Sequence, residues 1–169
     1  AVSWNATNDA LYYLYPSTME DAAIRAQWKT GGTVTGYTCT GTGGTITATT
    51  VDGTSMKTQT FTFDTVAAGS YKLVIFKPGK YVPKIVPITV ESTALDLGQL
   101  KLWLKGDVNG DGIVNGNDIQ RLYSHITGAS TLTDDDALIV ANANEDTAIN
   151  GNDIQRIFAH IVGSNVFSD

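Results

Sequence analysis

Cysteine is nearly absent from this chain, with Cys39 the only one among 169 residues. A single cysteine excludes an internal disulfide framework, so a secreted form would need another means of stabilisation, and a bound metal ion is the obvious one. No apolar run reaches about 18 residues, which predicts that no segment spans a membrane. The chain also lacks a basic start followed by an apolar run, so no signal peptide is visible, and the sequence reads as a mature protein or an excised piece.

Positive charge is scarce in the C-terminal part of the chain. Residues 106–169 contain two arginines, no lysine and ten Asp or Glu, for a net charge of −8. Residues 1–105 contain nine Lys or Arg against seven Asp or Glu, for a net charge of +2. An acidic segment argues against nucleic acid as a partner, because phosphate contacts need a basic face. It favours divalent cations, since two calcium ions would neutralise half of that net charge.

The N-terminal part is rich in Thr, Val, Gly and Tyr in short alternating runs, as β-strands are. Breaks such as GTGG, AAGS and KPGK separate these runs, and their spacing predicts an antiparallel β-sandwich. Ser17 and Glu20 have the spacing of a helix capping box and predict a short helix as far as about Trp28. The expected strands cover residues 11–15, 33–40, 45–51, 58–63, 70–76, 84–90 and 95–104.

Helical periodicity replaces this alternation after residue 105, which predicts two domains at residues 1–105 and 106–169. Gly128 and Gly163 follow two helical runs where a C-terminal capping glycine belongs. Thr133 and Asp136 resemble a capping box and predict a middle helix over residues 134–141. The apolar positions expected to face the core of this all-α unit are Ile119, Leu122, Tyr123 and Ile126, then Ile154, Ile157, Phe158 and Ile161.

A twelve-residue segment occurs twice, as DVNGDGIVNGND at 107–118 and as NANEDTAINGND at 142–153. Oxygen side chains recur at positions 1, 3, 5, 9 and 12, and position 7 offers a backbone carbonyl, as in EF-hand calcium loops. Each repeat is half an EF-hand, because it keeps only the outgoing helix. Two Ca²⁺ ions are therefore predicted, with ligands Asp107, Asn109, Asp111, Ile113, Asn115 and Asp118 in loop one and Asn142, Asn144, Asp146, Ala148, Asn150 and Asp153 in loop two.

Loop two is predicted to bind calcium more weakly than loop one. It has two carboxylates among its ligands instead of three, because Asn142 replaces the aspartate of position 1. Thr147 replaces the glycine of position 6, where a β-branched residue is expected to strain the turn. An ordinary Asn- and Gly-rich turn is the alternative for a lone loop, but two loops 35 residues apart in the same pattern favour calcium.

The duplicated loop and helix, the missing entry helix and the central connecting helix resemble a dockerin. The resemblance covers residues 106–169 and implies a secreted, non-catalytic module that binds two calcium ions and the cohesin of a scaffoldin or cell-surface protein, within a cellulosome-type complex for polysaccharide degradation. The segment VAAGSYKLVIFKPGKYVPKIVPITV is similar to the Ig-like X modules that precede some dockerins and stabilise or orient them. The implied cohesin contacts are Gly116, Asn117, Gln120, Arg121, Tyr123, Ser124 and His125, with Gly151, Asn152, Gln155, Arg156, Phe158, Ala159 and His160 as their twins.

The sequence GNDIQR is identical in both copies, which predicts that the module binds its cohesin in two orientations related by 180°. Gly–Asn at loop positions 10 and 11 departs from the Ser–Thr pair of the best-known dockerin class. Arg121 and Arg156 are expected to contact the partner, with a solvated helix face as the alternative. Three roles are open for His125 and His160. They are ordinary surface residues, they make binding pH-sensitive, or they bind zinc.

Two aromatic residues flank the acidic unit. Trp103 precedes the first loop, and Phe167 follows the last helix. Because the ends of this fold are expected to lie close together, the two rings are predicted to pack as a clasp. The alternative places Trp103 in the sandwich core or at the domain interface.

Two rival functions concern residues 1–105. An enzyme has little support, since no histidine lies there, Cys39 has no base to activate it, and the carboxylates are scattered. A carbohydrate-binding module is the other rival, because aromatic side chains can stack on sugars, although core and cross-strand packing is their commoner role. The candidate aromatics are Trp4, Tyr12, Tyr13, Tyr15, Trp28, Tyr37, Tyr71 and Tyr81.

Overall fold

The computed structural model describes residues 11–29, 44–52, 58–76 and 81–167. The chain divides into two compact units, which are described separately. The first contains most of the described residues up to Lys101, and the second contains Asp52, Tyr81, Val82 and the chain from Leu102 onward. No helix among the described residues is long and apolar enough to cross a membrane.

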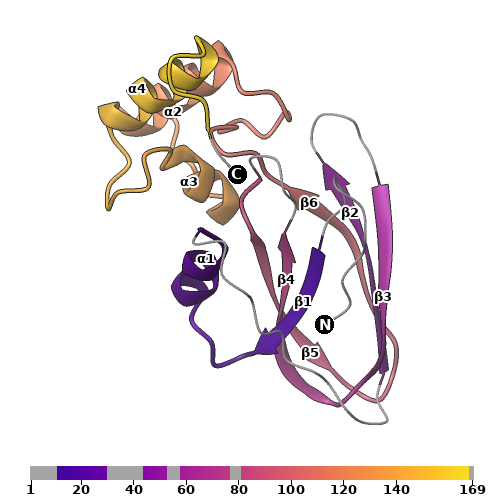
Figure 1. Cartoon of the computed structure of the whole chain (residues 1–169). Helices are drawn as coiled ribbons and strands as arrows, with labels where there is room; N and C mark the ends of the chain where they lie inside the picture. The colour runs from indigo at the N-terminus through magenta and orange to yellow at the C-terminus, as the bar shows by residue number, and fades with distance from the viewer. Residues whose placement is uncertain (1–10, 30–43, 53–57, 77–80, 168–169) are drawn as a thin grey trace. The chain divides into compact units, whose positions relative to one another are not determined.

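The first unit contains two three-stranded sheets (Figure 1). One has the order β1-β4-β5, with β1 at Leu11–Pro16, β4 at Gly69–Phe76 and β5 at Lys84–Val90, and both pairings are antiparallel. The other has the order β3-β2-β6, with β2 at Gly44–Asp52, β3 at Thr58–Val66 and β6 at Leu95–Leu102. Antiparallel strands are thus confirmed, while face-to-face packing of the sheets stays a prediction, and the expected strand 33–40 lies outside the described residues.

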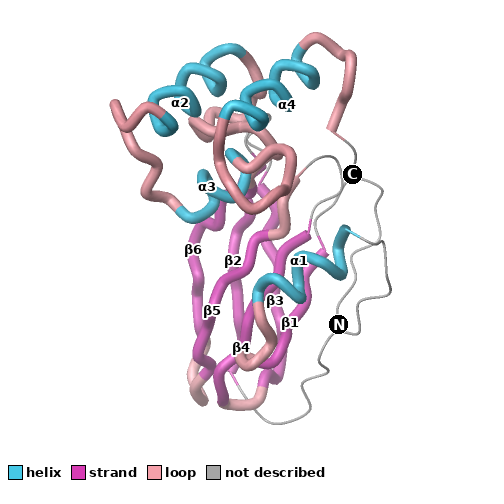
Figure 2. The backbone as a smooth tube through the Cα atoms, turned by 90° about the vertical axis from the view of Figure 1, so that its left-hand side faces the viewer, coloured by secondary structure: helices cyan, strands magenta, loops and turns pink. Residues whose placement is uncertain are grey.

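Helix α1 spans Asp21–Lys29 and lies across the β1-β4-β5 sheet (Figure 2). Ile24, which is fully buried, packs with Tyr15 and Val74 of that sheet. The predicted capping box was wrong, because Ser17 lies in a turn and the helix begins after Glu20, whose carbonyl accepts from the Ile24 backbone N–H at 3.1 Å.

The second unit is helical, with α2 at Gly116–Ile126, α3 at Asp135–Ala141 and α4 at Gly151–Ile161. The middle helix occurs where it was predicted, but its cap was misassigned: Asp134, and not Thr133, accepts from the N–H groups of Asp136 and Ala137. Asp134 prevails because its carboxylate also complements the positive end of the helix dipole. Gly128 and Gly163 have the left-handed backbone of C-terminal capping glycines, with φ of +76° and +75°.

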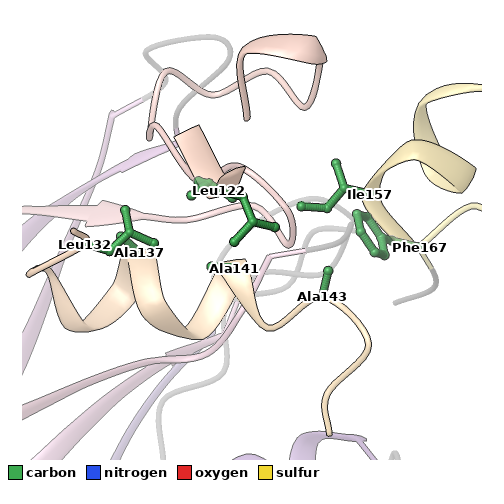
Figure 3. Close-up of a cluster of buried hydrophobic side chains, with 8 residues drawn as sticks. Leu122, Leu132, Ala137, Ala141, Ala143, Ile157 and Phe167 are labelled. Atoms are coloured by element: carbon green, nitrogen blue, oxygen red, sulfur yellow. The ribbon is translucent and has the colours of Figure 1, made fainter. Parts of the chain in front are cut away.

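The core of the second unit gathers side chains from all three helices and from the segments between them (Figure 3). Leu122 of α2 and Ile157 of α4 are completely buried at its centre. The prediction of the apolar face was half right, because Tyr123 and Phe158 are 60% and 55% exposed and Ile126 and Ile161 are each 38% exposed. The buried members are Val108, Leu122, Leu132, Ala137, Ala141, Ala143, Ile157 and Phe167.

The two ends of the second unit meet at a glycine. Gly106 has a φ of +84°, and a Cβ atom added there would lie 2.7 Å from Cε2 of Phe167. Trp103 packs against the same core that buries Phe167. The two aromatic residues therefore share one core, with the close approach made by Phe167 on the Gly106 backbone.

Candidate functional site

The first loop is organised by two buried aspartates. Asp107 is 1% exposed, and its carboxylate accepts from the backbone N–H groups of Gly110, Asp111 and Gly112 at 2.9 to 3.1 Å. Asp118 is fully buried and accepts from the backbone N–H groups of Asn109 at 3.1 Å and Asn115 at 2.8 Å. Positions 1 and 12 of the loop thus hold their carboxylates inward, and the bonded backbone wraps around them.

This arrangement concentrates negative charge. Burial raises the pKa of the Asp118 carboxyl, and the charges of Asp107 and Asp111 add to the rise, while the backbone hydrogen bonds from Asn115 and Asn109 oppose it. Buried carboxylates that repel one another are stable when a cation neutralises them. The loop therefore fits a hard divalent ion, which Asp107, Asp111 and Asp118 would hold together with neutral oxygens.

The second loop repeats only part of this pattern. Asp153 is fully buried and accepts from the N–H groups of Asn144 and Asn150 at 3.1 and 2.8 Å, as Asp118 does in loop one. At position 1, however, Asn142 donates its side-chain amide to the Asp146 carbonyl at 2.7 Å, and its Oδ1 atom is buried without a hydrogen-bond partner. A buried oxygen without a donor is costly, and a cation in the loop would satisfy it.

The predicted strain at Thr147 was placed on the wrong residue. Glu145, at position 4, has a φ of +61°. Among the described residues it is the one non-glycine residue with a left-handed backbone. Loop one has glycine at both comparable turns, with φ of +73° at Gly110 and +86° at Gly112. Loop two thus has a positive φ at position 4 alone, and the Glu145 carboxylate forms an ion pair with Lys105 at 2.7 Å.

The position-9 asparagines start the two helices. Asn115 caps α2 by accepting from the Asn117 N–H at 2.8 Å, and Asn150 caps α4 by accepting from Asn152 at 2.8 Å. In both helices the position-12 aspartate completes a reciprocal capping box. The same two side chains therefore orient the loop and begin the helix, so that an ion held at position 12 would also fix the helix.

The remaining predicted ligands are exposed. In the described part of the chain, no three His, Cys, Asp or Glu side chains form a ready-made metal cluster, so a calcium ion would need amide and backbone oxygens as well. This finding also gives the zinc alternative no support. The exposed predicted ligands are Asn109, Asp111, Ile113, Asn144, Asp146 and Ala148.

The arginines predicted to contact a partner are bound within their own unit. Arg121 donates from Nη1 to the Ser130 carbonyl at 2.6 Å and from Nη2 to the Thr131 carbonyl at 3.0 Å. Arg156 donates from Nη1 to the Asn165 carbonyl at 2.5 Å, and its guanidinium lies 4.4 Å from the Phe167 ring centre. A planar, five-donor group suits this pairing with consecutive carbonyls.

The two histidines bind the same two stretches of backbone as the arginines. His125 accepts at Nδ1 from the Leu132 N–H at 3.0 Å, and His160 accepts at Nδ1 from the Phe167 N–H at 3.1 Å. The stretches that run back along each helix are here called the return segments, residues 130–132 and 165–167. Each arginine and histidine pair thus fastens a return segment, which ends in the buried side chain of Leu132 or Phe167.

The duplicated unit is therefore longer than a loop and a helix, since it covers residues 107–132 and 142–167. The return segments could not be recognised as repeats from the sequence. Residues 128–132 (GASTL) and 163–167 (GSNVF) share little beyond their first glycine and last apolar residue. The spacing of 35 residues between Leu132 and Phe167 was the available signal. The other predicted contact positions are exposed or half-exposed: Gly116, Asn117, Gln120, Tyr123, Ser124, Gly151, Asn152, Gln155, Phe158 and Ala159.

The aromatic residues suggested as a sugar platform differ in their burial. Tyr15 and Tyr71 are buried at 1% and 8% exposure, and Tyr71 donates its hydroxyl to the Ala67 carbonyl at 2.8 Å. Burial raises the pKa of Tyr15 to about 12, with the nearby Tyr13 adding to the rise. Tyr13 and Tyr81 are half-buried, whereas Trp4 and Tyr37 and the side chains of Tyr12 and Trp28 lie outside the described residues.

Two loops with buried carboxylates, each followed by a capped helix, make the second unit a duplicated module. The family model of the dockerin type I domain matches residues 105–162. The chain thus contains a dockerin type I domain, a kind of domain that typically binds calcium and implies cohesin binding in a cellulosome. No curated protein and no solved structure matches the chain.

Proposed function

We propose that the chain is a non-catalytic attachment module whose dockerin, at residues 106–169, holds two calcium ions and binds a cohesin. The observation that carries the proposal is the pair of loops in which a buried position-12 aspartate is also the third residue of a helix. Calcium bound there would set the orientation of α2 and α4, whose exposed side chains then form a fixed surface. Such a module would anchor its parent protein in a secreted, cellulosome-type or cell-surface complex for polysaccharide degradation.

The ligands proposed for the two ions are those of the sequence prediction, with unequal strength. Asp107, Asp111 and Asp118 give loop one three carboxylates, while Asp146 and Asp153 give loop two two. The free Oδ1 atom of Asn142 supports a cation in loop two as well. Side-chain and carbonyl oxygens of this kind are what Ca²⁺ takes in six- to eight-fold coordination.

The N-terminal domain, residues 1–105, is proposed to be an X-module-like β-sandwich that stabilises or orients the dockerin. Antiparallel strands in both of its sheets support this proposal. The carbohydrate-binding alternative has lost Tyr15 and Tyr71 to the interior. Retention of the full chain on insoluble polysaccharide in EGTA, where cohesin binding is switched off, would favour that alternative.

A binding screen of the full chain against a panel of cohesins tests the proposed function. Binding is expected to at least one cohesin in calcium and to none in EGTA. The double variant Asp118→Asn/Asp153→Asn is the matched control, since it keeps the side-chain volumes and removes the two buried charges. Calcium-independent binding, or none to any cohesin, would overturn the proposal.

A further inference from the structure

Every acidic and basic side chain of α2 and α4 has a partner inside the dockerin. Asp118 and Asp153 are buried in the loops. The two arginines are bound to the return segments through carbonyl groups, and the two histidines through backbone N–H groups. Apart from these engaged groups, the outer surface of the two helices carries apolar, hydroxyl and amide side chains.

Helix geometry separates the fastened flank from the open one. Residues advance by about 100° around an α-helix, so Phe158 and Val162 lie on one side of the buried Ile157, and Arg156 and His160 lie on the other. The return segment covers the arginine and histidine side. The opposite side carries Phe158 and Val162, each 55% exposed.

The two repeats differ systematically on the open side of the helices and at the middle residue of each return segment. At four aligned positions the first repeat has a hydroxyl that the second lacks: Tyr123 and Phe158, Ser124 and Ala159, Thr127 and Val162, Thr131 and Val166. In the first repeat, two hydroxyls are turned back onto their own helix, Ser124 Oγ to the Gln120 carbonyl at 3.0 Å and Thr127 Oγ1 to the Tyr123 carbonyl at 2.9 Å. We call the second set, Phe158, Ala159, Ile161, Val162 and Val166, the α4 face.

We propose that the dockerin binds its partner mainly through the α4 face, in one preferred orientation, and that the α4 face fits an uncharged and largely apolar patch on that partner. This inference rests on the proposed function and specifies which half of the site carries it. Ile161 and Val166 are 38% and 47% exposed, so they add two further exposed apolar side chains to Phe158 and Val162. Burying it gains the transfer free energy of all these groups, whereas the hydroxyl-bearing surface of α2 gains less.

Exchanging the aligned residues between repeats tests the preference. The first variant of the full chain, Phe158→Tyr/Ala159→Ser/Val162→Thr/Val166→Thr, gives the second repeat the hydroxyls of the first. It is expected to weaken binding to the cohesin selected by the panel by at least about tenfold in saturating calcium. The reciprocal variant, Tyr123→Phe/Ser124→Ala/Thr127→Val/Thr131→Val, is the matched control and is expected to keep or raise the affinity. All eight positions are exposed or half-exposed, and an unchanged melting temperature in calcium confirms the fold.

Ionic strength tests the uncharged character of the contact independently. Salt screens interactions between charged groups but leaves apolar contacts in place. Between about 0.1 and 1 M NaCl, with calcium in excess, the dissociation constant is expected to change by less than about threefold. A much larger salt dependence would overturn the proposed partner surface.

The outcomes also separate the inference from the proposed function. If a cohesin binds in calcium and the two exchange variants weaken it equally, or the α2 variant weakens it more, the preference for the α4 face is wrong and the proposed function stands. Failure of the whole panel overturns both.

Discussion

The two repeated loops are alike at position 12 but differ at position 1. Asp118 and Asp153 are equally buried and accept equivalent pairs of N–H groups. At position 1, Asp107 collects three N–H groups, while Asn142 leaves an oxygen without a donor. The position that starts the helix is thus conserved between copies, and the position that sets the charge is not. Position 12 needs an aspartate because it completes the helix cap. Position 1 can vary, because a change there alters the ion affinity of the loop and leaves the helix in place.

The largest expected effect comes from removing the charge at position 12 of either loop. Asp118→Asn leaves loop one with two carboxylates, so its calcium affinity is expected to fall by about a hundredfold, towards that of native loop two. Asp153→Asn leaves one carboxylate, and loop two should then show no measurable binding. Calorimetric titration of each variant checks both outcomes. Equal residual affinities would show that carboxylate number does not distinguish the loops.

The contact between Phe167 and the Gly106 backbone gives the next largest effect, on the free energy of unfolding. Gly106→Ala places a Cβ atom against Phe167 at a positive φ, and we expect the free energy of unfolding to fall by about 2 kcal/mol. Gly128→Ala, also at positive φ but with nothing within 4 Å, is the matched control. It should cost about 1 kcal/mol. Urea unfolding in saturating calcium measures both, and equal costs would mean that Phe167 yields to the added methyl group.

Changing position 1 of loop two makes the loops more alike. Asn142→Asp adds a third carboxylate and gives the unpartnered oxygen a charge that a cation neutralises, although it loses the amide donor to Asp146. Calcium affinity at loop two is expected to rise by about tenfold. The calcium-free protein should become less stable at the same time. A calcium titration paired with melting in EGTA would show both changes, and unchanged affinity would contradict the role given to Asn142.

The arginine contacts are expected to contribute to stability without contributing to binding. Arg156→Lys removes a two-carbonyl contact and the guanidinium over Phe167, at a cost of about 1 kcal/mol. Arg121→Lys removes the contacts to the Ser130 and Thr131 carbonyls and should cost less. Urea unfolding gives the two costs, and cohesin affinity in saturating calcium should be unchanged. A loss of affinity without a loss of stability would restore the arginines as partner contacts.

The smallest effect concerns pH in the calcium-free protein. Because burial raises the pKa of Asp118, the folded state holds this proton more tightly than the unfolded state does. The stability from this group is therefore present below the unfolded pKa and is lost as the pH rises through the folded one. In EGTA, Asp118→Asn should weaken this decline, while Asp153→Asn serves as the comparison. Melting temperatures between acid and neutral pH test it, and parallel curves for wild type and Asp118→Asn would contradict it.

Local patterns predicted much of the dockerin, because helices and loops of this kind are encoded within a few residues. The three helices and the glycines after α2 and α4 occur where the sequence placed them, while the assignment of the loop residues as calcium ligands stays a prediction. Both Ser/Thr-based capping boxes failed, since the pattern occurs often by chance and a nearby Glu or Asp started each helix instead. The roles of Arg121 and Arg156 could not be read from their helices, because their acceptors are backbone carbonyls of an irregular segment nine and ten residues further on.

The return segments have a consequence for how such a module can change over generations. The side chains that fasten these segments and those proposed to face the partner lie on opposite flanks of the same two helices. Substitutions on the open flank can therefore accumulate with little penalty to folding, so that recognition drifts while the scaffold persists. A chain with this division is well suited to diversify its partners and equally suited to redesign in the laboratory.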